Sequence, residues 1–135
     1  APRGATTTVE WGGGTLQFRR IATRGRSAAA RSGGGTEHFD AAKVGASFRL
    51  RHWRAGDRFQ PIGMKAAVKL QDLFVNAKVP AAERRRRVVA ETADGVLFWV
   101  EGLRISECFK LDTTSRHALK WHWRRGDGGF AGVPA

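Results

Sequence analysis

Apolar residues recur at helical spacing in the middle of the chain. Between residues 66 and 78 most of them lie three or four positions apart, which places them on one face of a helix. Pro80 ends the pattern, because the residue before a proline avoids the helical region of backbone space. Since proline also suits the first turn of a helix, we expect one helix over 66–78 and a short second helix over 81–86. The apolar positions are Val68, Leu70, Leu73, Phe74 and Ala77.

An alternating pattern precedes this helical pair. Residues 47–53 alternate in character, as expected for a strand with two different faces. One face would be mainly apolar and the other would carry arginines, which suits a binding surface. The two sets are Phe48, Leu50 and His52, and Arg49, Arg51 and Trp53.

Glycine-containing turns predict two hairpins. Asp94-Gly95 separates the apolar runs 88–92 and 96–101. Three glycines beginning at Gly12 separate two shorter runs near the N-terminus, 7–11 and 15–19. A last strand is expected over 117–124, where Leu119, Trp121 and Trp123 would share a face.

Strands outnumber helices and flank one short helical pair, which predicts an α+β fold with a mostly antiparallel sheet. Residues 23–35 hold almost no large apolar side chain, so we expect a flexible loop there. We therefore divide the chain into an N-terminal hairpin with a flexible Gly/Arg-rich loop over 1–36, one domain over 37–125 and a disordered Gly-rich tail over 126–135.

Charge gives the first indication of a partner. Lys and Arg number 24 against 12 Asp and Glu, a net charge of +12, which favours a polyanion such as nucleic acid. Arginine dominates, which suits phosphate recognition, although a GC-rich genome would produce the same bias. Residues 49–87 alone hold 11 Lys and Arg against 3 acidic residues. Trp53 and Phe59 lie among these cations and either stack on bases or belong to the core.

Several classes of protein are disfavoured. The longest apolar run, 96–100, is too short to cross a membrane, so we expect a cytoplasmic protein with no membrane partner. His117 and His122 lie five apart on an expected strand and would face opposite ways, so we expect no metal site. Cys108 is interpreted as a small core residue rather than a nucleophile. We predict no catalytic residue, and the start at Ala1 rather than Met suggests a fragment.

Three blocks in the middle of the chain carry a family resemblance. Residues 51–65 are Arg-His-Trp-Arg-Ala-Gly-Asp-Arg-Phe-Gln-Pro-Ile-Gly-Met-Lys. Lys-Leu-Gln-Asp-Leu-Phe follows at 69–74 and Ala-Lys-Val-Pro at 77–80, and Trp-Val-Glu-Gly-Leu-Arg-Ile stands at 99–105 before Phe109-Lys110. In order and spacing these blocks resemble the C-terminal domain of bacterial tRNA(Ile)-lysidine synthetases, over roughly residues 39–123.

The resemblance implies a small α+β unit of the kind also found in a phenylalanyl-tRNA synthetase subunit. The full enzymes of this family use ATP, with Mg, to join lysine to the wobble cytidine of the CAU-anticodon isoleucine tRNA. Their chemistry belongs to an N-terminal catalytic domain with a Ser-Gly-Gly-x-Asp-Ser loop, which these 135 residues lack. We therefore expect this chain alone to be inactive and to need no cofactor. Its expected partners are tRNA(Ile), held near the acceptor stem, and that catalytic domain.

The blocks also suggest which residues act. We expect the cations of these blocks to contact the phosphate backbone: Arg51, Arg54, Arg58, Lys65, Lys69, Lys78, Arg84, Arg85, Arg86 and Arg87. Trp53 would stack on the RNA at the edge of this basic patch. Asp57 would orient Arg54 or Arg58. The residues expected to shape the motif are Gly56, Asp57, Pro61, Gly63, Asp72, Pro80, Gly102 and Arg104.

This chain departs from the family pattern at a few positions. Ala66 stands where glycine is usual, and Val88 where proline is frequent. Val68 replaces a second lysine, so one phosphate-facing charge is missing, which the run at 84–87 would offset. Two alternatives to RNA binding remain: a structural module that packs between domains without touching RNA, and a general DNA-binding module, for which no helix-turn-helix or zinc-finger spacing is found.

Overall fold

The computed structural model describes residues 5–31, 35–103 and 106–125, and the chain divides into two compact units. The first unit combines Ala1–Ala46 with Phe109–Ala135, and the second is Ser47–Cys108. We expected one domain over 37–125, whereas in chain order the second unit is inserted between the two parts of the first. The proposed tail, 126–135, lies outside the described residues. The expected α+β class with mostly antiparallel sheets is confirmed.

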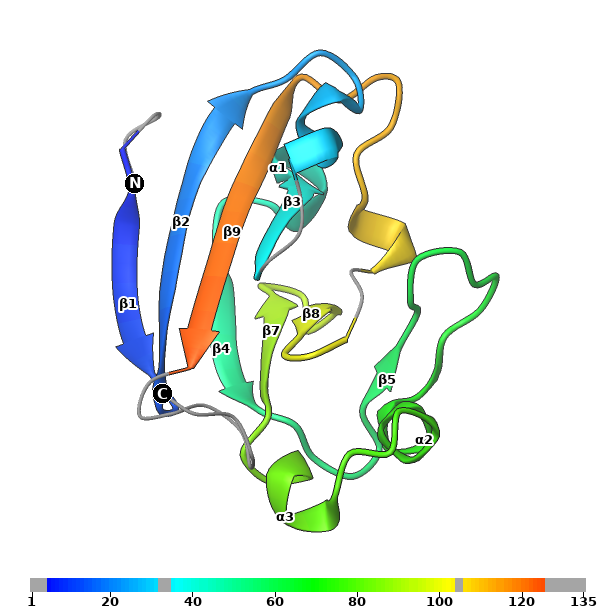
Figure 1. Cartoon of the computed structure of the whole chain (residues 1–135). Helices are drawn as coiled ribbons and strands as arrows, with labels where there is room; N and C mark the ends of the chain where they lie inside the picture. The colour runs from blue at the N-terminus through cyan, green and yellow to red at the C-terminus, as the bar shows by residue number, and fades with distance from the viewer. Residues whose placement is uncertain (1–4, 32–34, 104–105, 126–135) are drawn as a thin grey trace. The chain divides into compact units, whose positions relative to one another are not determined.

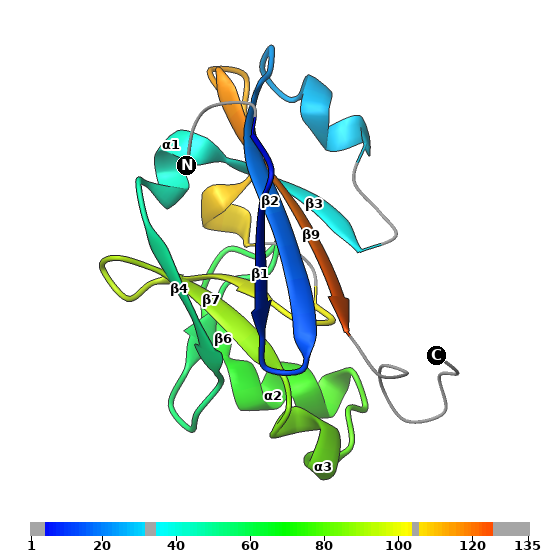
Figure 2. The ribbon, with the colours of Figure 1, turned by 90° about the vertical axis from the view of Figure 1, so that its left-hand side faces the viewer.

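A four-stranded antiparallel sheet organises the first unit. Its order is β1 (Thr7–Trp11), β2 (Gly14–Ala22), β9 (His117–Arg125) and β3 (Thr36–Asp40). Figure 1 shows the blue β2 beside the orange β9, with β1 along the outer edge of β2, and Figure 2 shows the same strands from the side. Trp11 pairs with Gly14, so only Gly12 and Gly13 form the turn. Both have positive φ (60° and 84°), as a type I′ hairpin turn requires.

The predicted apolar face of the last strand is confirmed. Leu119, Trp121 and Trp123 are buried, and Leu16 of β2 is buried opposite Trp123. Phe39 of β3 meets Trp121 edge-on, with ring centroids 5.8 Å apart. This face of the sheet therefore supplies large apolar side chains to the core.

Two short helical segments complete the first unit: the 3₁₀ helix η1 (Ser27–Arg31) and α1 (Ala41–Val44). The first lies in the segment expected to be a flexible loop, and Ala28 in it is fully buried beside Leu111 and Ala118. The Thr23 hydroxyl oxygen accepts a hydrogen bond from the Ala28 N–H at 3.2 Å. Alanine occurs both in solvated loops and at close contacts, so the sequence pattern alone does not reveal that Ala28 is buried.

The second unit holds a three-stranded sheet, a two-stranded ladder and two helices. The sheet order is β4 (Phe48–His52), β7 (Val88–Thr92) and β8 (Leu97–Val100), and the ladder pairs β5 (Arg58–Phe59) with β6 (Val68–Lys69). The Asp94-Gly95 hairpin is confirmed, since it joins β7 to β8. The buried core is formed by Phe59, Leu70, Phe74, Val79, Val89, Leu97 and Val100.

The helical pair is shorter than the sequence predicts. The first helix, α2, is Leu70–Asn76 rather than 66–78, and the second, α3, is Ala81–Arg84 rather than 81–86. Residues 68–69 instead pair with 58–59 as strands, a contact that helical periodicity cannot detect. Lys78, with a φ of 58°, leaves the helical region after α2. None of the helices in the described part of the chain has the length and apolar character to cross a membrane.

Candidate nucleic-acid interface

Arg51 is held inside the second unit by two carboxylates. Its Nη1 and Nη2 donate to the two oxygens of Asp57 at 2.9 and 3.0 Å, and its Nε donates to Glu91 at 2.5 Å. These three side chains are only 9–16% exposed. The planar guanidinium matches a carboxylate in two parallel hydrogen bonds, which makes this a strong arrangement. Arg51 is therefore committed to the fold rather than offered to a ligand.

The electrostatics of the pair agree with its geometry. Burial acts to raise the pKa of Asp57, but the hydrogen bonds from the Arg51 side chain and the Arg54 N–H, together with the charges of both arginines, outweigh it and hold that pKa below its usual value. The hydrogen bonds to Asp57 likewise raise the pKa of Arg51, against the effect of burial. Both groups therefore stay charged across the neutral range.

Asp57 also closes a turn, residues 54–57, within the first sequence block. Its carboxylate accepts the backbone N–H of Arg54 at 2.8 Å, and its own N–H donates to the Arg54 carbonyl at 3.1 Å. Gly56 has a φ of 94° at this turn, a conformation that favours glycine. Asp57 was expected to orient Arg54 or Arg58; it contacts Arg54 through the backbone N–H, whereas the guanidinium that it binds belongs to Arg51.

Trp53 packs against the helical pair. Its ring meets Phe74 of α2 with centroids 5.2 Å apart, and its Nε1–H donates to the Arg84 carbonyl at 2.5 Å. The side chain is partly buried against the core of the second unit. The indole therefore links the segment after β4 to both helices, as the core alternative for this residue describes.

The four arginines at 84–87 divide into two pairs. Arg84 donates from Nε to the Val79 carbonyl at 2.8 Å, and Arg87 is buried with its Nη1 3.0 Å from the Glu101 carbonyl oxygen. Arg85 and Arg86 are exposed. Gly102 lies beside the buried member, since a Cβ there would come within 1.7 Å of Arg87 Nη1.

The other cations of the sequence prediction lie on the surface. We call the following set the basic surface: Arg54, Arg58, Lys65, Lys69, Lys78, Arg85 and Arg86, all of them exposed. Most carboxylates of the same unit are occupied internally. Beyond Asp57 and Glu91, Glu101 accepts the Val88 N–H at 3.1 Å and Glu107 accepts the Gly63 N–H at 2.7 Å. Among the described residues of this unit, only Asp72 and Asp94 are exposed acids, so its surface is strongly positive.

Arg58 and Lys69 lie directly opposite each other in the β5–β6 ladder, and both are exposed. Arg58 is steadied by a hydrogen bond from Nη2 to the Ala67 carbonyl at 3.2 Å. In the described part of the chain no carboxylate forms an ion pair with either cation. Like charges at opposed positions repel, so an anion between these two side chains would stabilise the ladder.

The remaining motif residues support loops and helix ends. Pro61 forms an isolated bridge with Ser106, and its carbonyl accepts the Met64 N–H at 3.0 Å. The Pro80 carbonyl accepts N–H groups from Glu83 and Arg84 in α3, both at 3.0 Å. Asp72 stands in the first turn of α2, where a negative charge is favoured. Arg104, the last of this set, lies outside the described residues.

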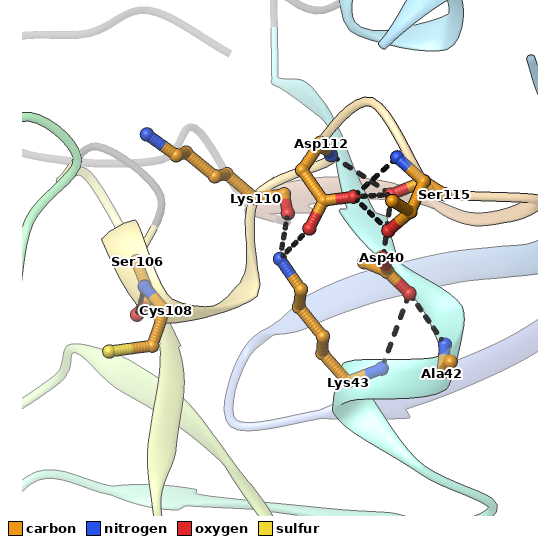
Figure 3. Close-up of polar contacts among 9 residues, drawn as sticks. Asp40, Ala42, Lys43, Ser106, Cys108, Lys110, Asp112 and Ser115 are labelled. Carbon is orange, nitrogen blue, oxygen red and sulfur yellow. Dashed lines mark hydrogen bonds and ion pairs between the residues drawn. The ribbon is translucent and has the colours of Figure 1, made fainter. Parts of the chain in front are cut away.

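The first unit contains a polar cluster that serves the fold. Figure 3 shows Asp40 at the N-terminus of α1, where it accepts the N–H groups of Ala42 and Lys43 at 2.9 and 3.3 Å. The Ser115 hydroxyl donates to Asp40 at 2.6 Å, and Lys43 forms an ion pair with Asp112 at 2.9 Å. These contacts tie α1 to the segment before β9. No group of three His, Cys, Asp or Glu that could hold a metal occurs among the described residues.

The partner carboxylates are what sequence reasoning missed. Glu91 reaches Arg51 across the β4–β7 pair, and the burial of Arg87 depends on β8 and the turn after it. The alternation of 47–53 did place Arg49 and Arg51 on one face. A predicted β4–β7 register would have placed Glu91 directly opposite Arg49 and next to Arg51, and so would have found this partner.

Comparisons with known proteins agree with these blocks. The family described as "TilS substrate C-terminal domain" matches residues 48–123. The tRNA(Ile)-lysidine synthases of Clostridium acetobutylicum and Geobacillus kaustophilus are 39% and 42% identical over 84 and 67 residues, which are 62% and 50% of this chain. These matches cover 18% and 14% of the two relatives, so the matched segments span less than a fifth of either one.

A solved structure extends the match to nearly the whole chain. A crystal structure of a TilS C-terminal domain superimposes with a TM-score of 0.71 and 26% identity, covering 94% of this chain and 95% of that one. The similarity therefore includes the first unit, which lies largely outside the matched residues 48–123. Sequence blocks, fold and relatives agree: the chain belongs to the family of TilS C-terminal domains.

Proposed function

We propose that this chain holds the tRNA substrate of a tRNA(Ile)-lysidine synthase by its phosphate backbone, near the acceptor stem. The observation that carries the proposal is the division of charge in the second unit. Seven exposed cations form the basic surface, while Asp57, Glu91, Glu101 and Glu107 accept hydrogen bonds within the protein. Duplex RNA is recognised mainly through phosphates and 2′-hydroxyls, which suits such a surface.

The proposal leaves the chemistry to the rest of the enzyme. The relatives are named as synthases, and in our proposal they join lysine to the wobble cytidine with ATP and Mg in a separate catalytic domain. This chain would supply binding and orientation, with the catalytic domain and the tRNA as its partners. The isolated 135 residues should therefore form no lysidine.

A salt titration of tRNA binding tests the proposal. If about five residues of the basic surface contact phosphates, the logarithm of the association constant should fall against the logarithm of salt concentration with a slope of roughly −3.5 to −4.5. A duplex DNA of equal length at the same salt should bind more weakly. A flat titration would contradict the proposal, and a chain that binds neither nucleic acid would favour the packing module instead.

A further inference from the structure

The sheet of the first unit has a polar face opposite its apolar one. Strand register places Gln17 of β2 beside His122 of β9, and His122 beside Thr36 of β3. One step along, Arg19 of β2 lies directly opposite Lys120 of β9. Because facing residues in an antiparallel pair share a side of the sheet, these five side chains form one surface. We call it the sheet site.

Within the part of the chain that the structure describes, the cation pair has no partner of opposite charge. No carboxylate in the described ranges forms an ion pair with Arg19 or Lys120. Their direct opposition is unfavourable without an anion, as it is for Arg58 and Lys69. Arg31 adds to the positive field: burial lowers the pKa of His38, and the charges of Arg31 and Lys120 lower it further. His38 is therefore buried and neutral beside the pair, and it adds no charge to this part of the face.

Hydrogen-bonding groups lie next to the cations. Thr36 Oγ1 and His122 Nδ1 are 2.8 Å apart, which fixes the imidazole ring. When the Thr36 hydroxyl donates this bond, the neutral ring carries its proton on Nε2, where it can donate to a ligand. Gln17 is exposed beside the ring and brings an amide donor and acceptor. These groups suit the edge of a nucleobase.

The sheet site contains a depression large enough for a small ligand. A depression of about 480 Å³ is lined by Thr6, Gln17, Phe18, Arg19, Thr36, Lys120 and His122. That volume falls in the range of small-ligand sites and admits one nucleotide, but a rigid duplex cannot lower a stacked base into it. Unpaired nucleotides, in contrast, often bind on the open face of a sheet, where bases meet side chains and cations hold the backbone.

We propose that the sheet site binds an unpaired nucleotide of RNA, with its phosphodiester between Arg19 and Lys120 and its base against Gln17 and His122. The inference rests on the proposed function, because it assigns an unpaired segment of the bound RNA to a second surface. Duplex phosphates go to the basic surface and an unpaired nucleotide goes to the sheet site.

Binding of a labelled six-residue oligouridine to the whole 135-residue chain tests this inference. The double variant Arg19→Gln/Lys120→Gln should lower the affinity roughly tenfold and make the salt slope shallower by about 1.4, since each phosphate contact to a single strand contributes about 0.7. Arg24→Gln/Arg26→Gln is the matched control, because it removes two exposed charges from the same unit. The control should keep the wild-type affinity and slope.

Two further measurements keep the inference falsifiable if a variant folds poorly. In the wild-type chain, oligouridine should shift the amide NMR signals of β2 and β9 around Arg19, Lys120 and His122. The substitution His122→Phe, which removes no phosphate-binding cation, should weaken oligouridine binding and leave the slope of its salt dependence unaltered. Shifts confined to the second unit, or equal competition by polyglutamate of the same charge, would overturn the inference.

A second variant separates this inference from the proposed function. Arg58→Gln/Lys69→Gln should weaken tRNA binding and leave oligouridine binding unchanged. If it retains full tRNA affinity, the proposed function fails. If it behaves as expected while Arg19→Gln/Lys120→Gln binds oligouridine like the wild type, the sheet site alone is refuted.

Discussion

Arg51 and Arg58 belong to the same sequence block, yet the structure uses them in opposite ways. Near the end of β4, Arg51 is mostly buried and bound by two carboxylates. In the β5–β6 ladder, Arg58 is exposed and faces another cation, Lys69. The first region satisfies its charges internally and stabilises the fold, while the second leaves charge unneutralised at the surface. A basic block thus contains two kinds of arginine, and only the partner carboxylates tell them apart.

The largest expected effect follows from breaking the internal region. Replacing Arg51 by Met leaves Asp57 and Glu91 without their guanidinium, and removing one member of a mostly buried ion pair costs about 3 kcal/mol. Urea denaturation followed by tryptophan fluorescence measures the loss. Arg54→Met is the control, because Arg54 is exposed, and it should change the free energy of unfolding by less than about 0.5 kcal/mol. Equal losses would show that the two regions do not differ as described.

A backbone change tests the burial of Arg87. The substitution Gly102→Ala places a side chain at a φ of 85°, and its Cβ would also clash with Arg87. We therefore expect a loss of about 2 kcal/mol in the free energy of unfolding. Gly63→Ala is the matched control, since Gly63 has a φ of 87° but nothing within 4 Å of its would-be Cβ. The control should lose about 1 kcal/mol. Thermal denaturation measures both variants. Equal decreases in Tm would argue against a buried Arg87 side chain that cannot move aside.

Acidity should weaken the internal region selectively. The pKa of Asp57 lies below its ordinary value of 3.8, so its pairing stabilises the fold above that pH and loses its effect as the pH falls through the lower folded-state value. Asp57→Asn should therefore cost about 1–2 kcal/mol at pH 7, and the difference from the wild type should vanish toward pH 2. Urea titrations at pH 7, 4 and 2 provide the comparison. A difference that stays constant across these pH values would contradict the ion-pair role.

The smallest effect on stability is expected in the exposed region. Arg58→Gln/Lys69→Gln removes two like charges that face each other and should raise or leave unchanged the free energy of unfolding, within about 0.5 kcal/mol. The same urea assay measures it. A decrease above about 1 kcal/mol in the free energy of unfolding would mean that these side chains stabilise the ladder rather than provide a binding surface.

Local chemistry made part of this fold predictable. The Asp94-Gly95 turn, the N-terminal hairpin and the last strand are predictable because glycine turns and period-two patterns act over a few residues, although Gly14 belongs to β2 rather than to the turn. The start of α2 was misplaced because Val68 and Lys69 pair with Arg58 and Phe59, a contact that no local pattern encodes. Ala28 was missed for a similar reason, since its burial depends on Leu111 and Ala118 far along the chain.

The candidate site was predictable in part for the same physical reason. Exposure of lysines such as Lys65 and Lys69 follows from residue type, because a lysine is seldom buried without a partner. The internal positions of Arg51 and Arg87 depend on strand pairing that brings acceptors from β7 and from the turn after β8. The opposition of Arg19 and Lys120 likewise requires the register of β2 on β9.

The salt dependence of tRNA binding by Arg58→Gln/Lys69→Gln tests the central claim most directly. If the exposed region binds the phosphate backbone, this variant should bind tRNA with a slope shallower than the wild type by about two units, one for each lost contact. Arg24→Gln/Arg26→Gln, with the same loss of net charge, should keep the wild-type slope. Equal slopes for the wild type and Arg58→Gln/Lys69→Gln would contradict the account.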